Sequence, residues 1–264
     1  MRSSRALLLN LVSLLTLGAS RQLPRRALLQ RAGGALAAPS AAALVTLPPL
    51  RAAADGESSP SQLIRDGEGR FRAGDVEGSV AAFDAALAKE PRVAPYLWQR
   101  GIALYYADKF AEAAEQFRRD VEVNPADVEE ALWHGVAMAR LDGLASARKG
   151  RLRVGQDRRP VLREIYALYS VDPGVGDAAA ARTRVEAFAA LDRPAPVLGS
   201  DAFYARLYLG LLAEADSDTS GARRAIEAAL QTEYAASSQD YMVSVARVHA
   251  KQRGWMVPPL PLRR

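Results

Sequence analysis

The spacing of apolar side chains predicts helices throughout the chain from Leu63 onward. Alanine, leucine, arginine and glutamate dominate this part, and glycine, aspartate and proline interrupt it at intervals. One predicted helix is apolar on two neighbouring faces, with Leu97 and Leu104 on the first face and Trp98 and Tyr105 on the second. A helix of this kind packs between other helices. The pattern therefore predicts an all-α fold of stacked helices.

A pattern of four positions recurs when the sequence is shifted by 34 residues. It consists of a glycine, a small residue 12 positions later, an aromatic residue 4 positions after that and a proline 8 positions further on. Glycine and the small residue allow two helices to approach, the ring fills the space between neighbouring pairs, and proline ends the second helix. The aligned residues are Gly67, Gly101 and Gly135, then Ser79, Ala113 and Ala147, then Phe83 and Phe117, and finally Pro91 and Pro125.

These residues resemble the tetratricopeptide-repeat family. The segments 60–93 and 94–127 match its pattern, and 128–160 matches in part, with Arg151 at the aromatic position and Arg159 at the proline position. The resemblance implies a right-handed α-solenoid of helix pairs, with two well-matched repeats, two degenerate repeats and a C-terminal capping helix. It also implies a non-catalytic adaptor or assembly factor that holds a segment of a partner protein in its concave groove.

The C-terminal half of the chain departs from the repeat. Its pattern predicts helices near 161–170 and 178–191 and a degenerate repeat that starts near Phe203. A closing helix is expected over 238–252, because an array needs a terminal helix with a polar outer face to stay soluble. The expected divisions are a cleavable leader (1–54), a flexible start (55–62), the helical array (63–255) and an extended tail (256–264).

The positive charge of the chain is concentrated in its leader. The whole sequence has 35 basic and 30 acidic residues, for a net charge of +5. Residues 1–54 hold seven arginines and no acid, so the remainder has 28 basic and 30 acidic residues and a net charge of −2. This balance argues against a nucleic-acid-binding protein. Because the sequence has no cysteine, disulfides and cysteine-based metal or redox sites are excluded.

The leader resembles two export signals in series. Residues 1–20 combine a charged start, an apolar run and small residues, as a signal peptide does. Over 24–54, Arg25 and Arg26 precede an alanine-rich stretch that resembles a twin-arginine signal. This arrangement resembles the leaders of thylakoid-lumen proteins, so we expect the plastid thylakoid lumen. The stroma, the mitochondrion and the secretory pathway stay open as alternatives.

The resemblance places a partner-binding groove on the concave face, lined by the first helix of each pair. Aromatic, arginine and amide side chains are common anchors in protein interfaces, and helical spacing puts several of them on this face. The alternative is that the aromatic candidates belong to the core of an irregular array. The candidate groove residues are Arg65, Arg72, Gln99, Tyr106, Trp133 and Arg140.

A basic segment is the second candidate site. Asp157 is the only acid between residues 148 and 163. Such a cluster suits an acidic partner or weak contact with anionic lipid headgroups, and the alternative is a solvated helix face with a loop. The basic residues are Arg148, Lys149, Arg151, Arg153, Arg158, Arg159 and Arg163.

A calcium loop at 216–227 is the third candidate site. Asp216, Asp218, Ser220 and Glu227 match positions 1, 3, 5 and 12 of an EF-hand loop. A calcium-responsive regulator is therefore the alternative function. The same residues also suit an inter-helix turn with a helix cap, and the sequence lacks the second loop with which EF-hands pair.

Catalytic chemistry is not expected. The chain has two histidines, His134 and His249, which cannot build a zinc site without cysteine. No nucleophile elbow or phosphate-binding loop is present, and helical spacing directs Glu129 and Glu130 to different faces. The sequence therefore predicts a chain that binds a protein partner, with no cofactor and no nucleic acid.

Overall fold

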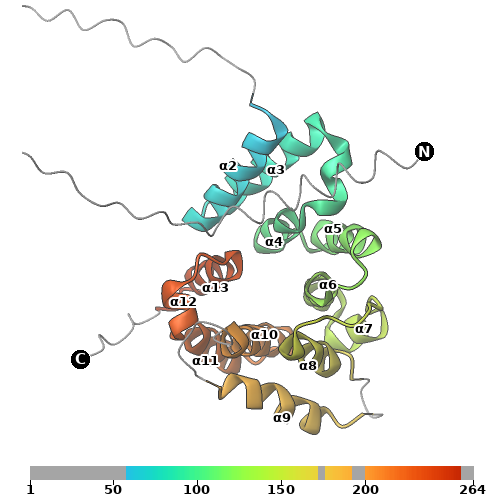
Figure 1. The fold of residues 1–264 in the computed structure, drawn as a ribbon, viewed down its shortest axis with the longest axis vertical. Coiled ribbons are helices and arrows are strands. Elements are labelled where there is room, and N and C mark those ends of the chain that lie inside the picture. The colour runs from blue at the N-terminus through green and yellow to red at the C-terminus, as the bar shows by residue number, and fades with distance from the viewer. Residues whose placement is uncertain (1–57, 172–175, 192–199, 257–264) are drawn as a thin grey trace, which may run out of the picture. The chain divides into compact units, whose positions relative to one another are not determined.

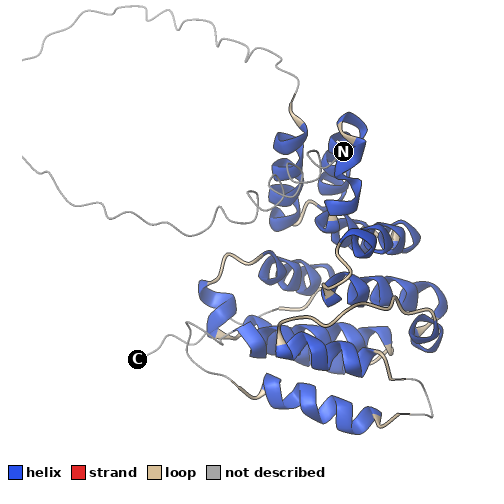
Figure 2. Ribbon diagram, turned by 45° about the vertical axis from the view of Figure 1, so that its right-hand side comes forward, coloured by secondary structure: helices blue, strands red, loops and turns tan. Residues whose placement is uncertain are grey.

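The computed structural model describes residues 58–171, 176–191 and 200–256, and the secondary structure of these parts is entirely helical (Figure 2). The all-α class predicted from the sequence is thus confirmed. The helices are α2 (Pro60–Ala73), α3 (Val76–Lys89), the 3-10 helix η1 (Pro91–Tyr96), α4 (Trp98–Tyr106), α5 (Phe110–Val123), α6 (Val128–Asp142), α7 (Leu144–Lys149), α8 (Pro160–Tyr169), α9 (Ala178–Ala189), α10 (Ser200–Ala215), α11 (Thr219–Leu230), α12 (Glu233–Ser237) and α13 (Tyr241–Gln252).

Consecutive helices pack side by side as hairpins, α2 with α3, α4 with α5 and α10 with α11 (Figure 1). Each of the three turns contains a residue with left-handed backbone, Gly74 (φ 85°), Asp108 (φ 57°) or Ser217 (φ 64°). In the first and third turns, Asp75 and Asp218 cap the next helix by accepting a backbone N–H three residues later. The first two left-handed residues are 34 positions apart, which is the period of the sequence pattern.

In each of the first two hairpins, the aromatic residue of the repeat pattern packs directly on the glycine of the same pattern. A Cβ atom on Gly67 would lie 3.0 Å from the ring of Phe83, and one on Gly101 would lie 2.7 Å from the ring of Phe117. These rings belong to the second helix of each hairpin. Because interiors are close-packed, the two helices can be this close only where the first helix has no side chain.

In the later helices, different residues make the close contact with a glycine. Arg151 lies beyond the end of the short helix α7, so it does not reach Gly135 as an aromatic ring would. Tyr169 of α8 supplies the ring instead, 2.6 Å from a Cβ atom built on that glycine. In α10, a Cβ atom on Gly210 would lie 2.8 Å from Ile226 of α11. The close approach of helices is therefore retained where the repeat sequence degenerates.

The C-terminal helix α13 returns to the first helices of the array (Figure 1). It packs against α2 and α11. Tyr241 of α13 stacks on Phe71 of α2 with ring centroids 5.4 Å apart, and it meets Trp98 of α4 edge-on at 5.3 Å. Helix α10 packs on α6 in the same way. The faces that α2, α4 and α6 turn inward are thus covered by α10 and α13.

Three helices of the C-terminal half lie where the sequence predicts them. Helices α8 and α9 fall within the predicted segments 161–170 and 178–191 to within one or two residues. The closing helix α13 starts later than the predicted position 238, because Asp240 caps it by accepting the backbone N–H of Met242 at 2.9 Å. Over the described parts of the chain, no helix combines the length and apolar character needed to cross a bilayer. The predicted leader lies outside the described residues, as does the predicted tail beyond Met256. The predicted flexible start (55–62) is wrong for residues 60–62, which belong to α2 because Ser59 caps that helix.

Candidate binding site

The chain's own C-terminal part fills the predicted concave groove. Tyr106 and Trp133 are only 4% and 2% exposed, whereas the groove prediction places both on an open face. The hydroxyl of Tyr106 lies 3.0 Å from Nδ1 of His249 on α13. Trp133 packs against the rings of Tyr105 and Phe117. The alternative interpretation, in which both aromatic candidates are core residues, describes their positions in this structure.

Two further groove candidates also contact the chain itself. Arg72 donates a hydrogen bond from Nη1 to Oγ of Ser244 at 3.0 Å, and its guanidinium lies 4.9 Å from the ring centre of Tyr241. Gln99 donates to the carboxylate of Glu68 at 3.2 Å, which links α4 to α2. These side chains stabilise the closed arrangement, so they are already engaged.

The last two groove candidates lie at the surface. The guanidinium of Arg140 lies 4.5 Å from the ring centre of Phe110 and 6.0 Å from that of Tyr105. Arg65 is exposed on α2. The six predicted residues therefore do not line one open groove in this structure.

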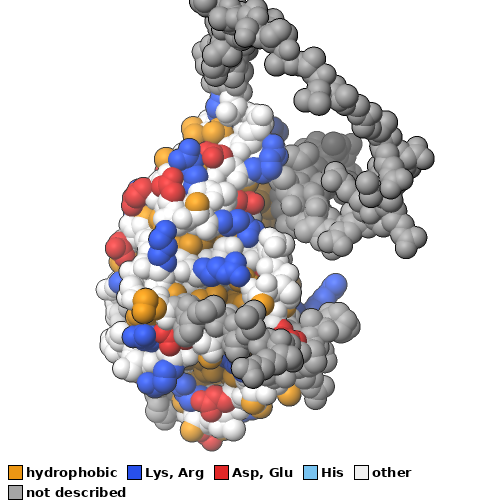
Figure 3. Space-filling model, turned by 90° about the vertical axis from the view of Figure 1, so that its left-hand side faces the viewer, with side chains coloured by type: hydrophobic (Ala, Val, Ile, Leu, Met, Phe, Trp, Pro, Cys, Tyr) orange, Lys and Arg blue, Asp and Glu red, His pale blue; other side chains and the backbone are white. Residues whose placement is uncertain are grey.

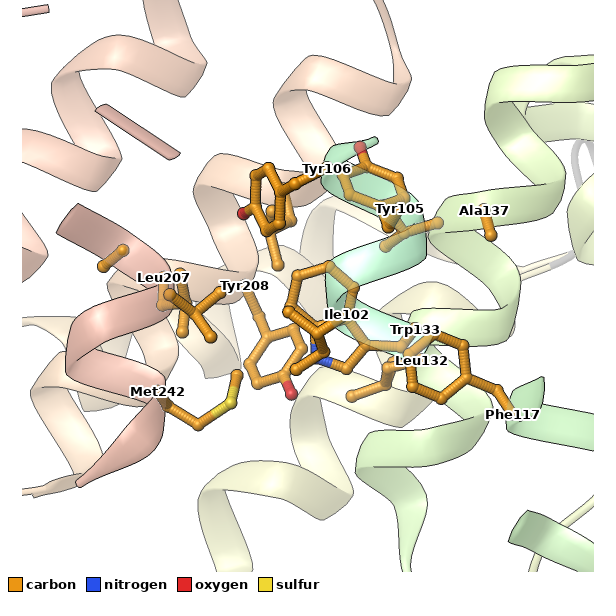
Figure 4. Packing of buried hydrophobic residues seen from close by; sticks show 14 of the residues in the cluster. Ile102, Tyr105, Tyr106, Phe117, Leu132, Trp133, Ala137, Leu207, Tyr208 and Met242 are labelled. Carbon is orange, nitrogen blue, oxygen red and sulfur yellow. The ribbon is translucent and has the colours of Figure 1, made fainter. Parts of the chain in front are cut away.

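A pocket remains where the first turns of α4, α6 and α13 meet α5 and α10. Its volume is about 190 Å³. Figure 4 shows how Trp133 lies between Phe117 on one side and Tyr208 on the other, with Met242 of α13 beyond. The lining consists of an apolar group, Trp98, Phe117, Trp133, Tyr204 and Met242, and an acidic group, Asp127, Glu129, Glu130 and Asp240. We call it the aromatic–acidic pocket.

Arg159 neutralises part of the acidic group. Its Nη2 atom lies 3.2 Å from Oδ1 of Asp127 and 2.8 Å from Oδ2 of Asp157, and its Nη1 atom donates to Glu129. Glu129 also accepts a hydrogen bond of 2.9 Å from the hydroxyl of Tyr208 on α10. One guanidinium thus connects the loop after α7 with the first turn of α6, and three carboxylates share it.

Glu130 and Asp240 have no basic partner within the ranges that the structure describes. Asp240 accepts hydrogen bonds from the hydroxyls of Tyr204 at 2.7 Å and Tyr234 at 2.6 Å. The Oε2 atom of Glu130 is buried and has no hydrogen-bond partner. The Nε1 atom of Trp133 is also buried and has no hydrogen-bond partner. Two residues that line the pocket, Glu130 and Trp133, therefore each carry a buried polar atom that no group in the described part of the chain satisfies.

Burial changes the protonation of the carboxylates at this site. It raises the pKa of Glu130 to about 9, helped by the negative charges of Asp127, Asp120 and Glu129. It also raises the pKa of Glu129 to about 7, although the charge of Arg159 acts in the opposite direction. Burial likewise raises the pKa of Asp120, on the neighbouring α5, to about 7. Near neutral pH, Glu130 keeps its proton because an additional negative charge is unfavourable here.

We expect the protein to lose stability between pH 7.5 and 9. An unfolded glutamate is deprotonated throughout this range, whereas folded Glu130 holds its proton up to about pH 9. The folded state then binds more protons than the unfolded state, so the free energy of unfolding falls as pH rises, by about 1 kcal/mol per pH unit. Urea titrations at several pH values measure this slope.

The variant Glu130→Gln isolates the contribution of this one group. It should flatten the slope between pH 7.5 and 9, since glutamine does not titrate. Exposed Glu112→Gln on α5 should leave the slope of the wild type unchanged. The histidines do not contribute to the slope between pH 7.5 and 9, because burial lowers the pKa of His134 and lowers that of His249 to about 4. A free energy of unfolding that stays constant or rises over this range would contradict the expectation.

The predicted basic segment does not form one continuous exposed patch. Arg159 lies at the aromatic–acidic pocket, and Arg163 donates from Nη1 to the backbone oxygen of Asp157 at 2.9 Å. The Nε atom of Arg148 is buried, and Arg151 donates to the backbone oxygen of Arg148 at 2.8 Å. Figure 3 shows the side of α12 and α13, away from this segment, where basic and acidic side chains are interspersed. The exposed members of the segment are Lys149, Arg153 and Arg158.

The predicted calcium loop is not formed. Helix α11 starts at Thr219, so most of the segment 216–227 is helical. Asp218 caps this helix by accepting the backbone N–H of Gly221 at 2.8 Å, and Glu227 accepts from Arg223 at 2.8 Å. A helix cannot wrap Asp216, Asp218, Ser220 and Glu227 around one ion. Among the described residues, no group of three or more histidine or acidic side chains is placed to hold a metal.

Sequence reasoning did not identify the aromatic–acidic pocket. Its lining comes from five helices, and two of them, α10 and α13, lie far along the sequence from α4, α5 and α6. Helical spacing predicted different faces for Glu129 and Glu130, whereas both line the pocket from the first turn of α6. The useful signal was the run of acids from Asp127 to Glu130 just before Trp133.

Two comparisons with known proteins were negative. No protein-family model matches the chain. A search of curated proteins also finds no match. The function is therefore inferred from the residues and the geometry of the site.

Proposed function

We propose that this chain is a non-catalytic interaction module of tetratricopeptide type, an adaptor or assembly factor that holds a segment of a partner protein. The recurring hairpin turns at Gly74 and Asp108 support the repeat, because they keep its 34-residue period. The packing of Phe83 on Gly67 and of Phe117 on Gly101 supports it further. In this proposal, the array is a short right-handed solenoid that α13 closes.

The aromatic–acidic pocket is the observation that carries the proposal. Pockets that bind ligands combine apolar walls with a few convergent polar groups. Here Trp98 and Tyr204 are only partly buried, while Trp133 and Met242 form the buried floor. Tryptophan and tyrosine are enriched among the residues that contribute most to protein interfaces. A partner segment would therefore bind at the edge of α13 and not along the full inner face.

The leader sequence supports the thylakoid lumen as the proposed place of action. There, help in assembling, repairing or processing a membrane complex would suit a soluble adaptor. The stroma, the mitochondrion and the secretory pathway stay as alternatives for the same interaction module. Sequencing the N-terminus of the mature protein isolated from its organelle distinguishes these locations, since the lumen proposal predicts a first residue near Asp55.

Partner capture with a pocket variant tests the binding proposal. We expect the mature chain to retain specific proteins from an extract of its organelle, and Trp98→Ala to lose them, because this change removes an accessible pocket wall. Met256→Ala is the matched control, since Met256 is 84% exposed and outside the pocket. Circular dichroism must show that both variants are folded. The proposal is wrong if Trp98→Ala captures the same proteins in the same amounts as the wild type.

A further inference from the structure

The aromatic–acidic pocket has two kinds of wall that suit one kind of ligand group. Trp98, Phe117, Trp133 and Tyr204 supply aromatic rings around the cavity of about 190 Å³. The face of an aromatic ring attracts cations, and tryptophan does so most strongly. Carboxylates attract the same groups through charge and accept their hydrogen bonds. A positively charged group is the only common ligand type that both walls favour.

The charge balance of the pocket also favours a cation. Four carboxylates line it, and among the described residues Arg159 is the basic side chain that pairs with them, through Asp127 and Glu129. Glu130 and Asp240 keep no basic partner in the described part of the chain. A buried carboxylate without a counter-charge is costly, so it either keeps a proton or binds a cation. The protein thus provides a position for one further positive charge.

The unsatisfied atoms indicate a polar ligand that carries this charge. The indole of Trp133 is 2% exposed, and its Nε1 donor has no partner. Figure 4 shows this nitrogen on the side of the ring that faces Tyr208. Glu130 lines the same pocket, and its buried Oε2 atom also has no hydrogen-bond partner. A ligand with several N–H donors and a nearby carbonyl oxygen, as in a peptide, would satisfy both atoms.

We propose that the aromatic–acidic pocket binds an arginine side chain of the partner segment. The inference rests on the proposed interaction function and names the chemistry that the pocket recognises. Arginine fits better than lysine because its planar guanidinium stacks on aromatic rings, is weakly hydrated and offers five donors. Those donors suit the carboxylates that line the pocket. The ring of Trp98, which is partly exposed, would cover the guanidinium from outside.

Small-molecule probes test this inference directly. The probe is N-acetyl-argininamide, and its matched control is N-acetyl-citrullinamide, which has nearly the same shape but no charge. Nuclear magnetic resonance of the indole N–H groups follows the three tryptophans. We expect the charged probe to shift the signals of Trp98 and Trp133 and to leave that of Trp255 in place. Citrullinamide should bind at least ten-fold more weakly, because a charge-assisted contact is lost.

Glu130→Gln tests the contribution of the unpartnered carboxylate. Binding of a cation expels the proton that Glu130 holds, so affinity for argininamide should be higher at pH 9 than at pH 6.5 in the wild type. In Glu130→Gln this increase should disappear, and affinity at pH 9 should fall about ten-fold. Exposed Glu112→Gln is the matched control and should behave as the wild type. The titratable and charged groups around Glu130 are Asp120, Asp127, Glu129, Arg159, Tyr204 and Asp240.

The results separate this inference from the proposed function. Equal shifts with argininamide and citrullinamide, or no shift at all in a folded protein, would overturn the arginine assignment. If capture of partner proteins still depended on Trp98 in that case, the interaction function would stand with another ligand group. If the probe shifts Trp98 and Trp133 as expected, arginine-to-citrulline replacement in a captured partner peptide should abolish its binding.

Discussion

Replacing Trp133 with alanine should lower the free energy of unfolding by about 3–5 kcal/mol. The indole is 2% exposed and packs against the rings of Tyr105, Tyr106 and Phe117, so its removal leaves a cavity where three helices meet. Replacing a groove residue on an open face with alanine would lower the free energy of unfolding far less. Urea or thermal unfolding of the purified mature chain measures the difference.

Two further variants keep this prediction specific. Trp133→Phe should cost clearly less than Trp133→Ala, since it preserves an aromatic ring in the same space. Met256→Ala should change stability by less than about 0.5 kcal/mol, because Met256 is 84% exposed. If Trp133→Ala is as stable as the wild type, then α10 and α13 do not cover this face in solution, and the open groove predicted from the sequence is correct.

Replacing Arg159 with methionine should lower the free energy of unfolding by about 3 kcal/mol. The change removes the shared partner of Asp127, Glu129 and Asp157, and Asp157 is only 5% exposed. The expected loss is at the low end for a broken buried ion pair, because the arginine side chain itself is 42% exposed. Chemical denaturation at pH 7 measures it.

Arg158→Met is the matched control for this prediction. Arg158 is the exposed neighbour in the same loop, and its replacement should stay within about 0.5 kcal/mol of the wild type. Acidification should recover part of the loss in Arg159→Met, since protonated carboxyl groups no longer need a counter-charge. Equal losses in the two variants would show that Arg159 acts only as a surface charge.

The local features of this fold could be predicted from the sequence, because short-range steric rules set them. A glycine 16 residues before an aromatic ring indicated the close contacts of Gly67 with Phe83 and of Gly101 with Phe117. The ends of α8 and α9 also followed from local patterns. The segment of Asp218 shows the limit of such patterns, since the spacing of an EF-hand loop and that of a capped helix share the same residues.

The closure of the array could not be predicted, because it depends on contacts between distant segments. Nothing in the repeat around Tyr106 indicates that His249, 143 residues later, will cover it. A closing helix was predicted over 238–252, but nothing in its sequence specified which helices it would pack against. The pocket depends on this same closure, so its acidic group around Glu130 was seen only as separate residues.

The packing of α13 on α2 also changes how the chain should fold. In an open array each repeat contacts only its neighbours, so unfolding can start at an end and spread. Here Arg72 bonds to Ser244, 172 residues away, and the described array has no loose terminal repeat. Contacts of such long range slow folding, because a large loop must close before they form. The chain should therefore fold more slowly than an open stack of the same length and unfold in one cooperative step.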